Sequence, residues 1–191
     1  MIDTSKLTKA ELHCHSDGLL DPAMLTALNS AGHELNIPPE GLRRRCPVDS
    51  ITQWTQEYTP YVSPHLEPAA LWQPLLIEQH VLRLKVQRVF YAELFVSGLL
   101  FAFTDIAALI EFFHELRHRV DEAAGSEMRV EFVICVGRGP KEKLERQLPR
   151  IEALHAESLV CGVALAGAEA DYPVQPLKTI IDQLRDLGLG M

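Results

Sequence analysis

Residues 9–18 read KAELHCHSDG, a short stretch of strand-like character that ends in a glycine. We expect a strand from Lys9 to Cys14, in which side chains two positions apart point to the same face. His13 and His15 would then share one face, and two imidazoles on one face can bind a single first-row metal such as zinc. The spacing alone is equally consistent with two unrelated, hydrogen-bonded histidines.

The residues around this pair are more specific than its spacing. AELHCHSDG at residues 10–18, followed by DPAML at residues 21–25, resembles the first strand of the adenosine deaminase family. In that family the two histidines are zinc ligands, and the aspartate that follows them binds the ribose end of the nucleoside. The resemblance implies that His13 and His15 bind a zinc ion and that Asp17 binds substrate.

A second stretch, VCGVALAGAE at residues 160–169, is similar to the fourth strand of the same family. There the strand ends in a Leu-Ala-Gly-x-Glu pattern whose glycine backbone contacts the purine ring. That position is Gly167, where the missing Cβ would let a flat base approach the main chain. The alternative is a glycine needed only for the turn. Weaker similarity extends to residues 130–138 and 91–94, so the resemblance covers most of the chain but rests on two specific motifs.

The rest of the chain alternates between strand and helix patterns. Apolar strand patterns fall at residues 89–96, 129–136 and 159–165. Helical patterns fall at residues 68–86, 104–123, 139–155 and 175–187. Strands that alternate with helices predict parallel βαβ units, and continuous apolar strands fit a sheet covered on both faces. We expect an α/β fold over residues 1–191, the N-terminal half of a (β/α)8 TIM-type barrel with four βα units, because a whole barrel takes about 250 residues.

Residues 19–67 are expected to form a helical insertion or lid after the first strand. Asp21 is a suitable N-cap and Pro22 a suitable first helical residue. Further short helices are predicted near residues 40–45 and 50–58. An insertion of this length after a strand end usually covers a site, although a surface subdomain with no ligand role is the alternative.

Composition restricts the partners. The net charge is -8 and the longest basic run is three arginines at residues 43–45, which argues against a nucleic-acid polymer or an anionic membrane. We expect this run to be solvated or, as the alternative, to meet a substrate phosphate. The four cysteines form no Cys-x-x-Cys pair, which indicates reduced thiols and a cytoplasmic protein. Asp105 and Glu111 interrupt the apolar run at residues 94–113, so we expect a strand and an amphipathic helix there and no membrane span.

Several residues depart from the family pattern. A large aliphatic residue is usual at the position of Ser16, acidic residues at those of Ala164 and Ala168, and an arginine near Phe95. These changes surround the expected site without touching the two histidines. They leave open whether adenosine or a related aminopurine is the substrate.

The family's remaining site residues have no counterpart here. A third metal histidine, a general acid/base glutamate, a further histidine and an aspartate ligand all follow the fourth helix in that family. The resemblance therefore implies a metal-dependent hydrolase that deaminates an aminopurine nucleoside such as adenosine, here as a truncated chain that we expect to be inactive alone. The alternative is a non-catalytic metal- or nucleoside-binding remnant, completed by a homodimer or another partner chain.

One competing motif is present at residues 114–118, which read HELRH. On a helix, His114 and His118 of such a motif bind zinc in peptidases, and Glu115 would be the general base. The apolar stripe of this helix passes through its other positions, and the extended peptidase pattern fails. We therefore expect a solvated helix face and keep a zinc peptidase as the weaker alternative.

Overall fold

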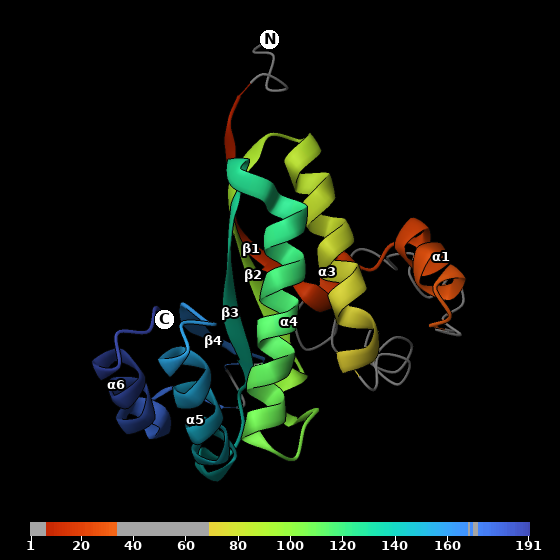
Figure 1. Cartoon of the computed structure of the whole chain (residues 1–191). Helices are drawn as coiled ribbons and strands as arrows, with labels where there is room; N and C mark the ends of the chain where they lie inside the picture. The colour runs from red at the N-terminus through yellow and green to blue at the C-terminus, as the bar shows by residue number, and fades with distance from the viewer. Residues whose placement is uncertain (1–6, 34–68, 168, 170–171) are drawn as a thin grey trace.

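The computed structural model describes residues 7–33, 69–167, 169 and 172–191 (Figure 1). One sheet holds the strands β1 (Lys9–His15), β2 (Val89–Ser97), β3 (Arg129–Gly137) and β4 (Gly162–Ala166), all parallel and in the order β1-β2-β3-β4. The helices are α1 (Pro22–Ser30), α3 (Ala69–Val86), α4 (Ile106–Ala124), α5 (Lys141–Ala156) and α6 (Lys178–Asp186). The predicted α/β class and its four βα units are confirmed.

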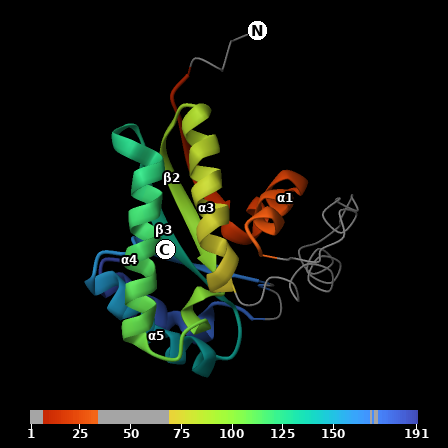
Figure 2. The same ribbon diagram turned by 45° about the vertical axis from the view of Figure 1, so that its right-hand side comes forward.

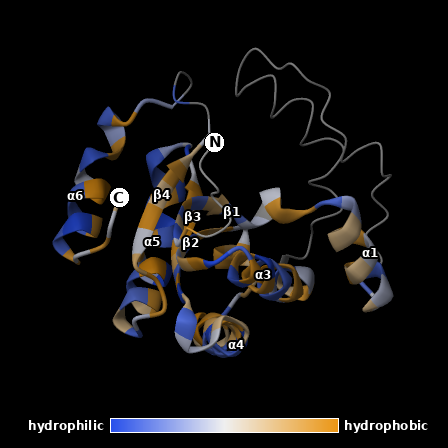
Figure 3. Ribbon diagram, turned by 90° about the horizontal axis from the view of Figure 1, so that it is seen from above, coloured by the Kyte–Doolittle hydropathy of each residue, from blue (hydrophilic) through white to orange (hydrophobic). Residues whose placement is uncertain are grey.

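The helices follow one another around the sheet. α3 and α4 lie side by side against β2 and β3, α5 lies beside α4, and α6 lies beside α5 (Figures 2 and 3). In β2, Leu94 and Val96 are at most 1% exposed and belong to the core beneath these helices. Phe95 and Val133 point to the opposite face of the sheet and lie outside that core. We call this opposite face the inner face.

A β-bulge interrupts β1 just before the two histidines. Glu11 pairs with Ala92 and Cys14 with Leu94, so β1 uses one residue more than β2 between these two pairs. Such a bulge re-aims the side chains that follow it. Strict alternation along the strand would have placed Glu11 on the face of His13, whereas its pairing with Ala92 turns it toward the helices.

The start of α1 follows the sequence prediction. Asp21 is the N-cap, with Oδ1 accepting a hydrogen bond from the Met24 main-chain nitrogen at 2.8 Å, and Pro22 is the first helical residue. The second carboxylate oxygen accepts a hydrogen bond from Arg83 of α3, also at 2.8 Å. Burial raises the pKa of Asp21, but the bond from Arg83 and those from main-chain nitrogens outweigh it and lower the pKa overall. The short helices expected near residues 40–45 and 50–58 lie outside the described residues.

β4 differs from its predicted range. The strand begins at Gly162, whereas the apolar pattern predicted Leu159. Leu159 and Val160 are 2% and 4% exposed, so they pack into the core before strand pairing begins. Apolar character therefore marked burial correctly but overestimated the length of the strand.

The chain after α6 returns to the edge of β4. The Gly190 main-chain nitrogen donates a hydrogen bond to the Cys161 main-chain oxygen at 3.0 Å, and the Gly190 oxygen accepts one from the Val163 main-chain nitrogen at 2.8 Å. These two hydrogen bonds form a parallel β-bridge between Gly190 and Gly162. A Cβ on Gly162 would lie 3.0 Å from the Gly190 oxygen, so this close approach favours glycine. Gly190 thus forms an isolated parallel bridge beside β4.

Within the described ranges, no helix is long and apolar enough to cross a membrane. The apolar run at residues 94–113 is divided between β2 and α4, as expected.

Candidate functional site

The two histidines of β1 converge at the end of the strand. The Nε2 atoms of His13 and His15 are 2.9 Å apart on the inner face. This separation suits a hydrogen bond between the two rings. It also lets both nitrogens reach one zinc ion, because zinc–imidazole bonds are about 2.0–2.1 Å long. The donor pair therefore fits two ligands of a zinc ion.

The described residues supply no more than this pair. Nowhere in residues 7–33, 69–167, 169 and 172–191 do three or more His, Cys, Asp or Glu side chains gather in a way that could hold a metal. A catalytic zinc site typically has three protein ligands. Any further ligand would therefore come from outside the described part of the chain.

An aromatic ring lies against both imidazoles. Phe95 of β2 stacks on His13 with ring centroids 4.4 Å apart and planes 19° apart. The same ring lies 5.2 Å from His15, at a tilt of 43°. The Phe95 side chain is 9% exposed, so the histidine pair has an apolar wall on its β2 side.

The opposite face of β1 is tied to α3. Cys14 Sγ lies 3.4 Å from Nε2 of His80. Burial, with the nearby Glu11 carboxylate, raises the pKa of the Cys14 thiol to about 11. Burial and Arg83 lower the pKa of His80. Both shifts favour the neutral forms near pH 7, and the contact between Cys14 and His80 joins β1 to α3.

A buried polar network joins the ends of β1 and β2. Ser16, directly after His15, is fully buried, and its hydroxyl donates to Oε1 of Gln73 at 3.4 Å. The Ser97 main-chain nitrogen donates to the same hydroxyl at 3.4 Å. Gln73 returns a 2.9 Å hydrogen bond to the Ser97 main-chain oxygen. Asp17 continues this turn, but its side chain lies outside the described part of the structure.

The ends of β3 and β4 are joined by Arg138. Its main-chain nitrogen donates a hydrogen bond to the Ala166 main-chain oxygen at 2.7 Å. Its guanidinium donates a hydrogen bond to the Tyr172 main-chain oxygen at 3.3 Å and forms an ion pair with Glu169 at 3.7 Å. Gly167 sits within this loop at φ +105°, which by itself requires glycine. The structure thus gives Gly167 a backbone role, and the predicted contact with a purine base remains a proposal.

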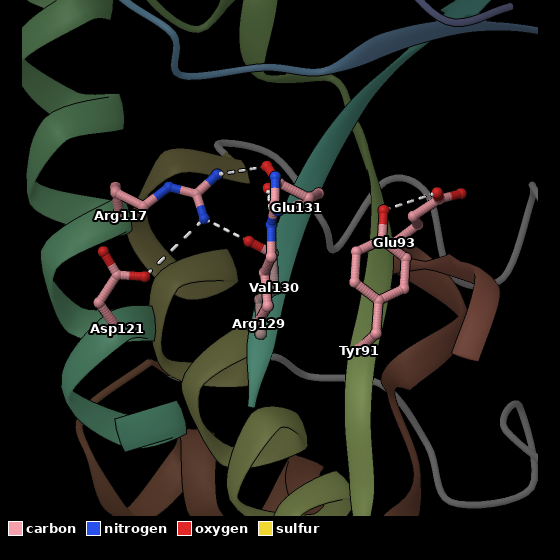
Figure 4. A network of polar contacts seen from close by, with 7 residues as sticks. All are labelled: Tyr91, Glu93, Arg117, Asp121, Arg129, Val130 and Glu131. Carbon is pink, nitrogen blue, oxygen red and sulfur yellow. Dashed lines mark hydrogen bonds and ion pairs between the residues drawn. The ribbon is translucent and has the colours of Figure 1, made fainter. Parts of the chain in front are cut away.

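Further polar contacts lie along β2, β3 and α4 (Figure 4). Arg117 of α4 donates to the Val130 main-chain oxygen and pairs with Glu131 at 3.7 Å. The Tyr91 hydroxyl donates a hydrogen bond to Glu93 Oε1 at 2.9 Å. Burial, and to a smaller extent this contact with Glu93, raises the pKa of Tyr91 to about 12. In the register of β1 with β2, Glu93 lies opposite the segment of β1 that holds Leu12 and His13, between the pairs Glu11–Ala92 and Cys14–Leu94.

The HELRH motif does not assemble a metal centre among the described residues. His114 lies 3.8 Å from Glu157, and His118 lies 3.7 Å from Glu122 of the same helix. Both histidine side chains are more than half exposed, at 55% and 67%. This geometry matches the predicted solvated helix face and gives the zinc-peptidase alternative no support.

Comparisons with known proteins were made for the whole chain, and no protein-family model matches it. The chain is 25% identical over 197 residues to an adenine deaminase from Albidiferax ferrireducens, a match that covers 97% of this chain and 53% of that protein. The chain thus spans about half the length of the curated relative it matches.

Two solved structures share the fold. The adenine deaminase from Arthrobacter aurescens superimposes with a TM-score of 0.62 at 18% identity, over 94% of this chain and 55% of that one. An amidohydrolase from Burkholderia ambifaria, solved with bound Zn, gives a TM-score of 0.68 at 16% identity, over 97% of this chain and 51% of that one. The four βα units therefore match the N-terminal half of a TIM-type barrel.

Proposed function

We propose that this chain contributes the first half of a metal-dependent hydrolase site that deaminates an aminopurine, as the nucleoside adenosine or as its free base. One observation carries the proposal: the Nε2 atoms of His13 and His15 converge to 2.9 Å at the carboxyl end of the first strand. Catalytic residues of TIM-type barrels come from this end of the strands. The similarity to an adenine deaminase supports the same class of reaction.

In this proposal His13 and His15 bind one zinc ion, Asp17 binds the sugar of a nucleoside, and Gly167 lies against the purine ring. Bound zinc lowers the pKa of a coordinated water to near neutrality. In the overall reaction, the water oxygen bonds to the ring carbon that carries the amino group, the carbon–nitrogen bond breaks, and ammonia leaves. The described residues hold and orient the metal ligands, and the proton-transferring groups come from elsewhere.

The two described histidines leave the proposed zinc site without further metal ligands and without an acid/base group. Two described ligands are fewer than a catalytic zinc site needs, so the proposal requires further ligands and an acid/base group on chain outside the described residues or on a partner. A homodimer or another chain that completes the barrel is part of this proposal. Residues 19–67, of which the structure describes 19–33, are proposed as its helical lid. A cytoplasmic location remains a prediction from the cysteine pattern.

The test compares two proteins in an ammonia-release assay with adenine and with adenosine. The first is the 191-residue chain, for which we expect no turnover. The second joins this chain to the remaining half of the Albidiferax ferrireducens relative, for which we expect zinc-dependent turnover. His13→Ala or His15→Ala in the joined protein should abolish turnover. His118→Ala, which removes an exposed histidine of α4, is the matched control and should leave it unchanged.

The outcomes separate the alternatives. Zinc and purine binding by the joined protein without ammonia release would favour the non-catalytic remnant. Zinc that remains bound after His13→Ala and His15→Ala but is lost after His114→Ala would contradict the assignment of the metal ligands. Turnover by the short chain alone would show that its site is complete.

A further inference from the structure

The sheet sets three aromatic rings together at the end of β1. Phe95 is the direct pairing partner of His15 between β1 and β2. Its ring stacks on His13 at 4.4 Å and lies 5.2 Å from His15. Because the pairing register fixes where Phe95 leaves the backbone, the position of the ring beside both imidazoles follows from the fold.

Phe95 is not part of the hydrophobic core beneath α3 and α4. Its neighbours Leu94 and Val96 belong to the apolar cluster beneath α3 and α4, whereas Phe95 lies outside that cluster on the inner face. Its side chain is nonetheless only 9% exposed. The ring contacts found for it are with the two histidines, so they account for part of its burial.

We propose that Phe95 is a positioning residue for the metal centre, holding the imidazoles of His13 and His15 so that their Nε2 atoms converge. The inference rests on the proposed function, in which these histidines are the metal ligands. An unrestrained histidine side chain loses rotamer freedom when it binds a metal. A flat wall that restricts both rings beforehand reduces that loss, which is how supporting residues preorganise a site.

Zinc binding to the full 191-residue chain tests this, by competition with a chromophoric chelator and zinc alone. Phe95→Leu keeps an apolar side chain but removes the flat ring, and we expect the zinc dissociation constant to rise on the order of 10-fold. Phe95→Tyr keeps the ring and should restore wild-type affinity. Val133→Ala is the matched control, because Val133 pairs with Phe95 from β3 on the same inner face, and its affinity should stay at the wild-type value.

A second measurement needs no metal. In the metal-free wild-type chain, nuclear Overhauser effects should connect the imidazole protons of His13 with those of His15 and with the Phe95 ring. The contact between the two imidazoles should disappear in Phe95→Leu and persist in Phe95→Tyr. A structural role alone would lower the unfolding midpoint of Phe95→Leu without changing this contact.

The two measurements distinguish two failures. If wild type binds no zinc but the imidazole contact is lost in Phe95→Leu, the two histidines do not hold zinc without further ligands, and the positioning role stands. If Phe95→Leu retains both zinc affinity and the imidazole contact, the positioning role is wrong and the proposed function is untouched.

Discussion

The side-chain amide of Gln73 donates a 2.9 Å hydrogen bond to the main-chain oxygen of Ser97. Gln73 is on α3 and only 2% exposed, and its own oxygen faces the Ser16 hydroxyl. A single buried side chain therefore connects a helix to the ends of the first two strands. Because Ser16 directly follows His15, this connection also fixes the turn that carries the candidate metal ligands.

We expect Gln73→Leu to lower the free energy of unfolding by about 1–3 kcal/mol, because it leaves the partly buried Ser97 oxygen and the buried Ser16 hydroxyl without this partner. Urea denaturation measures the change. Gln183→Leu is the matched control, since Gln183 is exposed on α6, and its effect should stay within about 0.5 kcal/mol. Equal losses in the two variants would contradict a specific role for the network.

The hydrogen bond between Asp21 and Arg83 predicts a pH dependence. The pKa of Asp21 is lower in the folded than in the unfolded chain. Its contribution to stability is therefore fully present above the unfolded value of about 3.9 and is lost as the pH falls through the lower folded value. Asp21→Asn should reduce the free energy of unfolding at pH 7 by no more than about 1 kcal/mol, because the pair is partly exposed.

The difference between wild type and Asp21→Asn should shrink as the pH is lowered through this range. Arg83→Gln is the control, because it removes the hydrogen-bond donor and should remove most of the difference at pH 7. A difference that is constant from pH 7 into acid would show that the carboxylate charge does not matter.

Burial and the contact with Glu93 raise the pKa of Tyr91 to about 12. The folded value lies above the ordinary value of about 10, so the contribution of Tyr91 to stability is present below pH 10 and lost as the pH rises toward 12. Absorbance titration of wild type minus Tyr91→Phe isolates its curve. Glu93→Gln should lower the pKa of Tyr91, because it removes the negative charge beside the hydroxyl. An unchanged curve in that variant would show that the Glu93 contact does not raise the pKa of Tyr91.

The fold could be predicted because its signals are local. Apolar strands alternating with helical patterns identified all four βα units, and Asp21 with Pro22 marked the start of α1. The predicted start of β4 was too early for a physical reason. Leu159 and Val160 are buried but do not belong to the strand, and an apolar pattern indicates burial, not strand pairing.

The candidate site could be predicted only in part. The pairing of His13 with His15 on one face followed from strand periodicity, but the bulge that turns Glu11 away depends on the register with β2. The role of Phe95 likewise depends on a neighbouring strand that lies about 80 positions later in the sequence. Gln73 carried no signal either, because a single polar residue within an apolar helical stripe is not informative until its partners are known.

The edge of the sheet at β1 leads to the last prediction. In the described residues, β1 pairs with β2 on one side and has no strand on its other side. An unpaired strand edge beside an apolar side chain promotes association with another chain. Leu12 in β1 is such a side chain, at 58% exposed. We therefore expect the chain to associate with a second copy, or with a partner that completes the barrel.

Light scattering over a range of concentrations should show mass rising above that of one chain. Leu12→Lys places a charge on the edge and should shift the chain toward the monomer, because charged side chains protect strand edges. Leu71→Lys is the matched control: Leu71 is 62% exposed but lies on α3, away from the edge, so the wild-type association should persist. A wild-type monomer at every concentration would contradict the prediction, and an equal shift in both variants would show that general hydrophobic contact, and not the β1 edge, causes the association.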